Sequence, residues 1–336
     1  MPRLGAVAVD GKRVRVSVAL CTHNGAEFLG EQLSSILGQS RPPHELVLSD
    51  DASTDGTVEL AAGIMAGHPE VDFRVLRNDP PLGVTKNFER AVKATTGELI
   101  ALSDQDDVWH SGRLERIIAE FEARPELLLL HGDARLVDAS GSPLGRALFE
   151  AIDTTAWELE RINSGHAFEA LVRRNLATGA TVVFRRDLLE RALPFPGSWV
   201  HDEWLAVIAA ASGHGTVDFL AEPLVDYRQH GGNQIGARKL GPAGKLRRLM
   251  EPRRQRNARL VAAFDELERR LAQLPVAPDV LAVAREKAEH ERVRNRYPEG
   301  RLRRVAPVLR EFRTGRYALS GRGLPDVVRD LLQPVD

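Results

Sequence analysis

Short apolar runs alternate with amphipathic stretches along the N-terminal part of the chain. Residues 14–21 alternate between apolar and polar side chains and are rich in β-branched residues, which predicts a strand. Apolar positions from Phe28 to Leu37 recur at helical spacing, so a helix follows. The order repeats, with strands predicted over 45–49, 73–76, 99–103 and 127–132 and helices over about 55–66, 86–95 and 112–123. This alternation predicts an α/β fold with a parallel, helix-covered sheet.

The strand predicted over 99–103 runs directly into three acidic residues, Asp104, Asp106 and Asp107. Like charges at a strand end repel one another, and that cost is tolerated where a divalent cation and its phosphate ligand neutralise them. Because side chains alternate along an extended chain, Asp104 and Asp106 point to the same side. The alternative is an acidic loop that merely solvates its charges.

A second acidic pair, Asp50 and Asp51, follows the strand predicted over 45–49. The ligand crevice of an open parallel sheet lies outside the carboxyl ends of its strands, so the two acidic strand ends can face one bound molecule. Asp55 lies in the segment 53–57, which is typical of a turn leading into a helix. We therefore interpret Asp55 as structural.

Three blocks of sequence, 16–24, 46–57 and 97–107, resemble in order and spacing those of the family 2 glycosyltransferases. The resemblance covers roughly residues 14–235. It implies the GT-A fold, a Rossmann-like α/β fold that binds nucleotide sugars on a mostly parallel central sheet with helices on both faces. In this chain a helical C-terminal extension is expected to follow.

The resemblance assigns the nucleotide pocket to the first two strand ends. Asp51 is expected to hydrogen-bond the pyrimidine base of the donor, with Asp50 assisting. Thr22 and Asn24 are expected to line the pocket. His23 stands where the family often has an aromatic residue, and its ring can stack on the base.

The motif Asp104-Gln105-Asp106 matches the family's DxD element. In the family the last Asp contacts the metal, Mn2+ or Mg2+, and the first reaches the ribose or a metal-bound water. Asp106 and Asp104 are therefore the expected metal and nucleotide ligands. Asp107 matches a further acidic position, whose use the resemblance does not specify.

The segment 224–234 is predicted to be a strand that ends in a polar loop. Its Tyr-Arg-x-His-Gly-x-Asn pattern at 227–233 resembles the bacterial rhamnosyltransferase-like branch, in which a late His or Arg approaches the diphosphate or metal. His230 is therefore a candidate metal ligand and Arg228 a weaker phosphate candidate. The alternatives are an ordinary surface histidine and a structural arginine.

Lys86 and Asn87 follow the turn at Gly83, at the start of a predicted helix. Helix N-termini favour anions, so both side chains are candidates to reach the nucleotide. A solvated helix face is the alternative.

The catalytic candidate comes from the segment 199–206, which follows a glycine-containing strand predicted at 178–186. Inverting sugar transfer needs one carboxylate to take the proton of the acceptor hydroxyl. In family 2 enzymes this base is the Asp of an acidic or His-Asp pair before a helix, which here is Asp202. The alternative role is an N-terminal cap for a helix at 203–212, and the two roles are compatible.

Length and composition fit a catalytic domain with an extension. The 336 residues, 43% of them hydrophobic, exceed a single ordinary domain of about 100–200 residues. We predict a leader at 1–13, a catalytic domain at 14–236 and a helical extension at 237–336, with the catalytic domain divided into a nucleotide-sugar-binding half (14–125) and an acceptor half (126–236).

Charge and cysteine content exclude some partners and compartments. The net charge of −1 argues against nucleic-acid binding. The single cysteine, Cys21, cannot form an internal disulfide, and no stretch approaches the ~18 apolar residues of a membrane span. The N-terminal residues lack the apolar core of a secretion signal. We expect a cytoplasmic protein.

Basic residues concentrate after residue 237, over 238–256 and again at 301–304, where they alternate with apolar residues. One interpretation is peripheral contact with the inner face of the cytoplasmic membrane. The other is a helical extension whose arginines face water or pair with glutamates. Prolines at 275, 278, 298 and 307 predict several short helices.

Together these features predict an inverting, metal-dependent transfer of one sugar from a nucleoside-diphosphate donor to a hydroxyl of a glycan, lipid-linked or small-molecule acceptor. The likeness at 201–204 and 227–233 favours dTDP-L-rhamnose as donor. One alternative is a UDP-hexose or UDP-N-acetylhexosamine transferase of the same fold. The other is a non-catalytic nucleotide-sugar sensor, which would not need Asp202.

Overall fold

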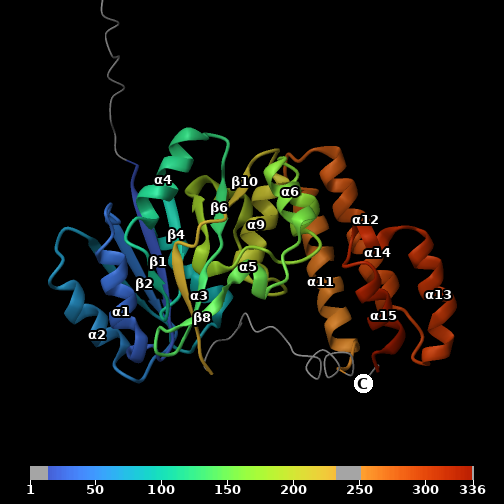
Figure 1. Cartoon of the computed structure of the whole chain (residues 1–336), viewed down its shortest axis with the longest axis horizontal. Coiled ribbons are helices and arrows are strands. Elements are labelled where there is room, and N and C mark those ends of the chain that lie inside the picture. Colours follow the sequence, from blue (N-terminus) through green and yellow to red (C-terminus); the bar gives the residue numbers. More distant parts are fainter. Residues whose placement is uncertain (1–13, 232–250, 335–336) are drawn as a thin grey trace, which may run out of the picture.

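The computed structural model describes residues 14–231 and 251–334 and is built around a seven-stranded sheet (Figure 1). Its strands lie in the order β10 (Val217–Leu220), β6 (Leu129–Gly132), β9 (Val183–Arg185), β4 (Leu99–Ser103), β1 (Val16–Thr22), β2 (Glu45–Asp50) and β3 (Asp72–Arg77). All pairings are parallel except those of β9, which is antiparallel to both β4 and β6. The predicted parallel, helix-covered sheet is confirmed.

Helices cover both faces of this sheet because both sets of alternating strand side chains are apolar. Val18 and Leu20 of β1 belong to the core shared with α1 (Ala26–Leu37), α2 (Thr57–Met65) and α4 (Arg113–Ala123). Ala19 and Cys21 point to the opposite face, toward α3 (Val84–Ala94) and α9 (His201–Ala211). The period of two along β1 therefore fixes which helices lie on which side.

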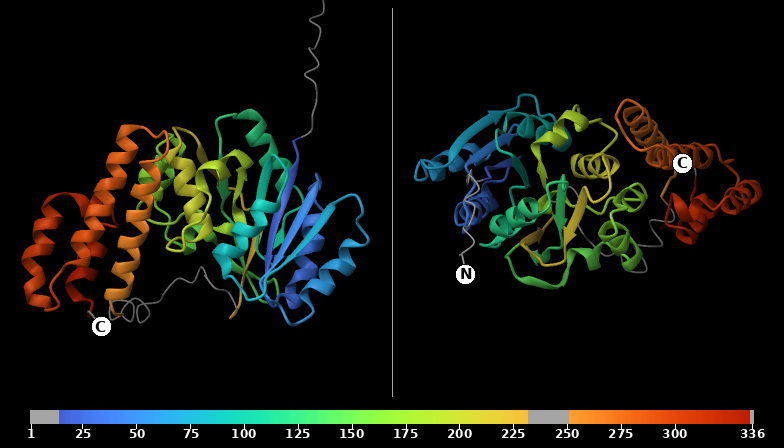
Figure 2. Two further views of the ribbon diagram at one scale, coloured as in Figure 1. Left: turned by 180° about the vertical axis from the view of Figure 1, so that it is seen from behind. Right: turned by 90° about the horizontal axis from the view of Figure 1, so that it is seen from above.

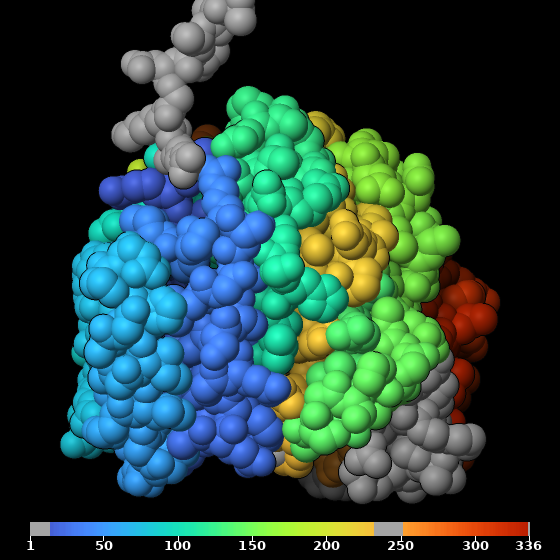
Figure 3. All heavy atoms as spheres, turned by 60° about the vertical axis from the view of Figure 1, so that its left-hand side comes forward, coloured from blue at the N-terminus to red at the C-terminus, as the bar shows by residue number. Residues whose placement is uncertain are grey.

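A second sheet of four short strands lies beside the first. Its order is β5 (Val108–Trp109), β11 (Val225–Gln229), β7 (Arg135–Asp138) and β8 (Pro143–Ala147). In the space-filling view the gold surface, which belongs to the part of the chain that contains β11, lies between the teal segment after β4 and the green segment around β8 (Figure 3). This sheet brings the predicted strand at 224–229 against the acidic end of β4.

Further short helices lie within residues 14–231. Between β8 and β9 are α5 (Leu148–Ala151), α6 (Ala156–Asn163) and α7 (Ala167–Leu171), and α8 (Leu189–Ala192) follows β9. The predicted strand at 178–186 is strand only over Val183–Arg185, because a 3-10 turn occupies Gly179–Thr181. The helix predicted at 203–212 begins two residues earlier, at His201.

The C-terminal part is a helical bundle at the end of the molecule away from α1 and α2 (Figure 2). It contains α11 (Arg254–Leu271), α12 (Pro278–Asn295), α13 (Arg301–Arg313), α14 (Arg316–Leu319) and α15 (Leu324–Leu332). It packs against the rest of the chain through α11, where the Trp199 indole donates a hydrogen bond of 2.8 Å to the Ala263 carbonyl. Phe264 meets the same indole edge-on, with ring centroids 5.3 Å apart.

Two predictions for this bundle need correction. Pro278 starts α12 and Pro298 separates α12 from α13, as predicted, but Pro307 lies inside α13. The helices α11 and α12 have 18 residues each and are not short. The predicted leader at 1–13 and the basic residues at 238–250 lie outside the described residues. No helix in the described ranges combines the length and apolar character needed to cross a bilayer.

Candidate active site

The carboxyl ends of β4, β1 and β2 form one edge of the central sheet. Leu20 pairs with Ser103, and Thr22 pairs with Asp50. The segment 104–107 therefore lies beside the loop that follows β1, which itself lies beside Asp50 and Asp51. The structure thus brings the two acidic strand ends to the same edge, as their parallel pairing requires.

Asp50 organises the loop between β2 and α2. Its carboxylate accepts a hydrogen bond of 2.8 Å from the Thr22 hydroxyl, and it also accepts the backbone N–H of Ser53 at 2.9 Å and the Ser53 hydroxyl. The side chain is buried. Asp50 and Thr22 therefore bond to each other, and Asp50 also bonds to Ser53, so both side chains hold the conformation of this loop.

The Asp51 carboxylate holds the segment that leads into α3. Its Oδ1 accepts hydrogen bonds from the Leu82 backbone N–H (2.7 Å) and the Asn78 side chain (2.8 Å). Its Oδ2 accepts the N–H of Gly83, at the N-terminus of α3, at 2.8 Å. Three donors satisfy three of about four lone-pair positions, so a carboxylate buried in this way retains capacity for one further donor.

Asn78 and Asn87 support this arrangement. The Asn78 amide also donates to Asn87 Oδ1 at 2.9 Å, and the Asn87 amide donates to the Ser49 carbonyl at 2.8 Å. Both side chains are buried. Asn87 therefore supports Asp51 through Asn78, and these contacts give no support to the prediction that it reaches the nucleotide.

Lys86 has protein partners that the sequence did not indicate. Its ammonium donates hydrogen bonds of 2.6 Å to the Glu89 carboxylate and to the Phe195 carbonyl. These contacts tie α3 to the loop before α9. The prediction that Lys86 binds the nucleotide finds no support in these contacts.

A side-chain clamp joins the loop after β1 to the DxD element. The Gln105 amide oxygen accepts the backbone N–H of His23 at 2.7 Å, and its nitrogen donates to the His23 carbonyl at 3.1 Å. A Cβ on Gly25 would overlap the end of the Gln105 side chain, so a larger residue there would displace the Gln105 amide from this position. Gln105 was not a predicted site residue, although its place between two aspartates could have singled it out.

His23 and Asn24, in the loop after β1, are exposed. The His23 ring bonds the Asp51 carbonyl at 2.6 Å through Nδ1, which orients the imidazole. Asn24 has φ of 49°, a left-handed conformation that Asn tolerates, and its Oδ1 accepts the Thr54 N–H at 2.9 Å. Asp55 accepts the backbone N–H groups of Ala26 and Thr57, which confirms its structural interpretation.

The segment 104–107 places the carboxyl groups of Asp104, Asp106 and Asp107 close together, with little exposure to solvent. Burial, together with Asp106 and Asp202, raises the pKa of Asp104 to about 8. Burial also raises the pKa of Asp107, whose Oδ1 accepts the Arg228 N–H at 3.0 Å. Its Oδ2 is buried without a hydrogen-bond partner among the described residues. Full ionisation of this cluster is therefore unfavourable without additional positive charge.

His230 and Arg228 approach the cluster from β11 and the loop after it. The His230 imidazole Nε2 lies 2.7 Å from Asp106 Oδ2, and its ring stacks on Phe28 with centroids 4.7 Å apart. The Arg228 guanidinium is 2% exposed and bonds the Asp106 and Ala139 carbonyl oxygens. Arg228 therefore holds the backbone of Asp106, and these contacts give no support to a role as a phosphate ligand. The His230 imidazole contacts the side chain of Asp106, a predicted metal ligand.

Tyr227, on the same strand, was missed by the sequence analysis as a site residue. Its phenol is buried, and burial together with Asp107, Asp104, Asp106 and Asp202 raises its pKa. A phenol among four carboxylates stays protonated and can donate a hydrogen bond to them. The signal in the sequence was its place in the pattern at 227–233.

Asp202 faces the same cluster from the first turn of α9. Its Oδ2 accepts the Gly179 N–H at 2.8 Å, and its Oδ1 accepts the Asn175 amide at 3.2 Å and the Glu203 N–H at 2.6 Å. Because α9 begins at His201, Val200 is its N-cap residue and Asp202 is not. The capping alternative for a helix at 203–212 is therefore wrong in its detail, although the carboxylate still binds a first-turn N–H.

The next residue, Glu203, also has a carboxyl group whose pKa is raised by burial. Burial, and to a lesser extent Asp202, raises its pKa to about 7, while Lys287 of α12 opposes the shift. In the unfolded chain the carboxyl has its ordinary pKa of 4.5. The folded protein therefore loses stability when pH rises from about 4.5 through about 7, since the unfolded chain ionises first.

We expect Glu203→Gln to stabilise the protein at about pH 8 and to have little effect at about pH 4.5, because only the ionised carboxylate is penalised by burial. Thermal unfolding of both proteins across this range measures the difference. The gain should grow between these two pH values and then stay constant. A difference that does not depend on pH would show that Glu203 is not buried in this way.

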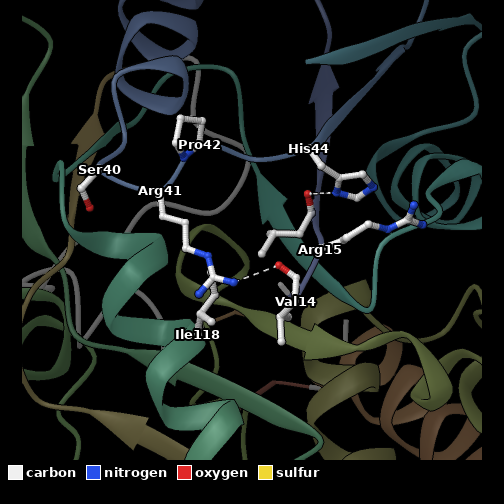
Figure 4. Close-up of a pocket in the computed structure, with 8 residues that line it drawn as sticks. Val14, Arg15, Ser40, Arg41, Pro42, His44 and Ile118 are labelled. Atoms are coloured by element: carbon white, nitrogen blue, oxygen red, sulfur yellow. Dashed lines mark hydrogen bonds between the residues drawn. The ribbon is translucent and has the colours of Figure 1, made fainter. Parts of the chain in front are cut away.

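A cavity of about 220 Å³ lies at the opposite edge of the sheet from these carboxylates (Figure 4). Val14, just before β1, is one of the residues that line it. Arg41 and His44 line it but are bonded to the Val14 and Val16 carbonyl oxygens. These basic side chains therefore bind the backbone at the start of β1. The cluster of acidic residues at the carboxyl ends of the strands is the better candidate site.

Within residues 14–231 and 251–334, no three His, Cys, Asp or Glu side chains are grouped closely enough to hold a metal ion by themselves. The chemistry of the cluster nevertheless fits a divalent cation. Asp104 and Asp106 supply hard oxygen donors, and His230 supplies an imidazole. Mg2+ in phosphate-processing sites commonly takes one or two carboxylates and completes its shell with substrate phosphates and waters.

Residues 17–193 match the sequence profile described as Glycosyl transferase family 2. The chain belongs to this family. The family resemblance identified from the three sequence blocks is thereby confirmed, and the mixed α/β sheet with its helical C-terminal part agrees with it.

Curated relatives are distant and partly covered. An uncharacterized glycosyltransferase of Nostoc sp. is 26% identical over 227 residues, which span 66% of this chain and 66% of the relative. Uncharacterized proteins of Mycobacterium tuberculosis are 26% identical over 222 residues but are covered over only 59% of their length. A dTDP-rhamnosyl transferase, RfbG of Shigella flexneri, is 24% identical over 227 residues, or 65% of this chain and 74% of the relative.

Solved structures share the fold. The mannosyltransferase PcManGT from Pyrobaculum calidifontis, in complex with GDP-Man and Mn2+, has a TM-score of 0.55 at 20% identity, covering 90% of this chain and 76% of that one. Residues 1–349 of Staphylococcus aureus TarS, in complex with UDP-GlcNAc, give a TM-score of 0.56 at 16% identity, covering 94% and 89%. At these identities the likeness establishes the architecture.

Proposed function

We propose that this protein transfers a single sugar from a nucleoside-diphosphate donor to an acceptor hydroxyl, with inversion at the anomeric carbon. The observation that carries the proposal is the convergence of Asp202 with the DxD carboxylates, close enough to raise the pKa of Asp104. The nucleotide-binding loop with Asp51 lies on the neighbouring strand end. Membership of glycosyl transferase family 2 supports the same reaction class.

Donor binding is assigned to the loops after β1 and β2. Asp51 retains capacity for one N–H donor of a pyrimidine base, and the His23 ring, fixed by the Asp51 carbonyl, offers a face for stacking. The Gln105 clamp keeps this loop in register with the DxD element. One rigid edge of the sheet thereby serves both the base and the diphosphate.

Asp202 is proposed as the general base. Its carboxylate is fixed by the Gly179 N–H and the Asn175 amide, so it can accept the proton of an acceptor hydroxyl without reorienting. The acceptor oxygen then attacks the anomeric carbon while the bond to the diphosphate breaks. One base is sufficient for inversion, because no glycosyl-enzyme intermediate is formed.

A divalent cation, Mn2+ or Mg2+, is proposed to be held by Asp106 and Asp104 with His230 adjoining. When bound, it supplies charge that stabilises the departing diphosphate. Arg228 keeps Asp106 in place through its backbone carbonyl, and Phe28 keeps the His230 ring in place by stacking. The complex of PcManGT with GDP-Man and Mn2+, which shares this fold, supports the assignment.

For the donor we propose dTDP-L-rhamnose, on the pattern at 201–204 and 227–233 and the similarity to the Shigella flexneri dTDP-rhamnosyl transferase. The alternative is a UDP-hexose or UDP-N-acetylhexosamine, supported by the fold shared with TarS in complex with UDP-GlcNAc. The acceptor is proposed to be a hydroxyl of a glycan, a lipid-linked saccharide or a small molecule.

A donor screen by nucleotide release tests this proposal. dTDP-rhamnose, UDP-glucose and UDP-GlcNAc are each incubated with the full chain, a panel of hydroxyl acceptors and Mn2+, Mg2+ or a chelator. We expect release with one donor, dependent on metal and stimulated by acceptor. Tight donor binding with no release under any combination would instead support the non-catalytic sensor.

We expect Asp51→Ala to weaken nucleotide binding by about 1.5–3 kcal/mol, the contribution of a charge-assisted hydrogen bond. Calorimetric titration with dTDP and UDP measures it. Asn78→Ala is the matched control, because it removes one partner of the Asp51 carboxylate but leaves the carboxylate itself. Nucleotide affinity that is unchanged in Asp51→Ala would move the base-binding site elsewhere.

A further inference from the structure

Helix α13 leaves its more apolar face exposed and buries a face that is largely polar. Val308, with the polar side chains of Arg304 and Glu311, packs into the C-terminal bundle. A different set of apolar residues points to solvent: Leu302 is 90% exposed, Leu309 46%, Phe312 44% and Val305 41%. A surface helix usually has a single apolar stripe, which it buries.

These exposed residues form one continuous stripe. Leu302, Val305, Leu309 and Phe312 are spaced by three, four and three positions, which places them on the same side of a helix. The neighbouring helix α15 adds Leu324, Val328 and Leu332 at spacings of four, exposed by 65%, 42% and 47%. Two adjacent helices at the end of the molecule therefore leave large apolar side chains in water.

Basic residues flank the α13 stripe. Arg301, Arg303, Arg310 and Arg313 are exposed, and none of them has an acidic partner within the described ranges. The only acidic residue of α13, Glu311, is buried and bonds the His290 ring at 2.7 Å. The exposed surface of α13 thus carries positive charge alone.

The basic residues noted at 253–256 and 301–304 differ in how far they are exposed. Arg253 is buried and donates to the carbonyl oxygens of Arg294 and Tyr297, and Arg304 is buried and donates to those of Asp330 and Gln333. These two arginines therefore neither face water nor pair with a glutamate in these contacts, and they are not part of a basic surface. The exposed basic and apolar surface lies on the outer side of 301–313, which includes Arg301 and Arg303 of the predicted basic segment.

We propose that the outer face of α13 docks on the surface of an anionic lipid bilayer. A helix that lies in the interface buries an apolar stripe among the acyl chains while flanking arginines contact anionic headgroups, and α13 carries both features. A second copy of this chain is a poorer occupant, because pairing two α13 faces would bring the unpartnered arginines of both copies together.

Such docking deepens the proposed function, on which its biological meaning rests. A catalytic site held at a bilayer surface suits an acceptor that is itself lipid-linked, which is one of the three acceptor classes proposed above. Lipid binding itself does not depend on turnover. The two proposals can therefore fail separately.

Vesicle sedimentation with the full chain tests the inference. The vesicles contain phosphatidylcholine alone or phosphatidylcholine mixed with phosphatidylglycerol, at low and high salt. We expect binding only to the anionic vesicles, and we expect it to fall as salt rises. Equal binding to both compositions, or no binding to either, would overturn the proposal.

Two variant pairs assign the surface. Arg303→Gln with Arg310→Gln should lower partitioning roughly 25-fold, at roughly fivefold for each arginine. Leu302→Gln with Leu309→Gln should abolish sedimentation. Leu60→Gln on α2 and Arg269→Gln on α11 are the matched controls, because both side chains are exposed on other helices and should leave partitioning unchanged.

Two further measurements separate the alternatives. Light scattering without lipid should give the same mass for the wild type and the leucine pair, whereas a dimer that the leucine pair dissociates would replace the bilayer by a second copy. Nucleotide affinity by calorimetry should be the same in all variants. Vesicle binding without nucleotide binding would leave this inference standing and reject the proposed function.

Discussion

Asp106→Asn is expected to abolish metal-dependent turnover while the fold is retained. The substitution keeps the shape of the side chain and one oxygen, but it removes the negative charge that a cation at the end of β4 requires. It also changes the partner of the His230 imidazole, which lies 2.7 Å from Asp106 Oδ2. Stability should not fall, because removing one of several crowded carboxylates relieves repulsion with Asp104 and Asp107.

Nucleotide release measured against Mn2+ and Mg2+ concentration tests this expectation, with thermal unfolding as the check on folding. Asp72→Asn provides the matched control, since this aspartate is exposed on the edge strand β3 and far along the sheet from β4. The control should retain the wild-type rate. A folded Asp106→Asn protein with near-normal turnover at low metal concentration would remove Asp106 from the metal site.

The central sheet was predictable because its strands carry their signal locally. Residues 16–22, 45–50 and 99–103 are buried throughout, and in the sequence they appear as short segments rich in apolar and β-branched residues, with a few polar positions, bounded by turn residues. The helices between them have a clear apolar stripe. Parallel connection then follows from the alternation itself, and with it the meeting of the acidic strand ends at one edge.

The small sheet was not predictable in the same way. Its strand β5 has two residues, and β8 is mostly exposed and contains glycine and proline. Its pairing joins β11 to β7, which lie about ninety positions apart in the chain. Neither periodicity nor turn chemistry encodes such a pairing, because it depends on how the acidic end of β4 and the late strand pack in three dimensions.

Candidate site residues were easier to locate from the sequence than their hydrogen-bond partners. The positions of Asp51, Asp106 and Asp202 followed from strand and helix ends together with the family pattern. The hydrogen bonds of Asn78 to Asp51 and of Asn175 to Asp202 did not, because each joins segments far apart in the sequence. Isolated asparagines in loops carry no local signal that separates such a role from a turn.

The C-terminal helices show the limit of reading charge from sequence. Arginines at 253, 294 and 304 are buried and bonded, while those at 301, 303 and 310 are exposed. The difference depends on the helix face that packs against the bundle. In α13 the more apolar side is the exposed one, so apolar periodicity alone does not identify the side that packs.

Asp202→Asn should lower transfer by at least ~100-fold, the contribution typical of a general base, while donor and metal affinity stay close to wild type. An amide cannot accept the proton of the acceptor hydroxyl. The wild-type carboxylate accepts N–H groups at both oxygens, from Gly179 at Oδ2 and from Asn175 and Glu203 at Oδ1. Asparagine can satisfy only one side, so we also expect stability to fall by about 1–3 kcal/mol.

That loss of stability does not prevent a decisive measurement. Turnover and calorimetric donor binding are compared well below the unfolding temperature of the variant, where a folded protein that binds donor but does not transfer separates the base from the fold. Glu203→Gln is the matched control, because it makes the same carboxylate-to-amide change one residue further along α9. It should retain turnover within a few-fold. If Asp202→Asn remains active and Glu203→Gln is inactive, Glu203 is the base, and if donor affinity is lost together with turnover, Asp202 belongs to the donor site.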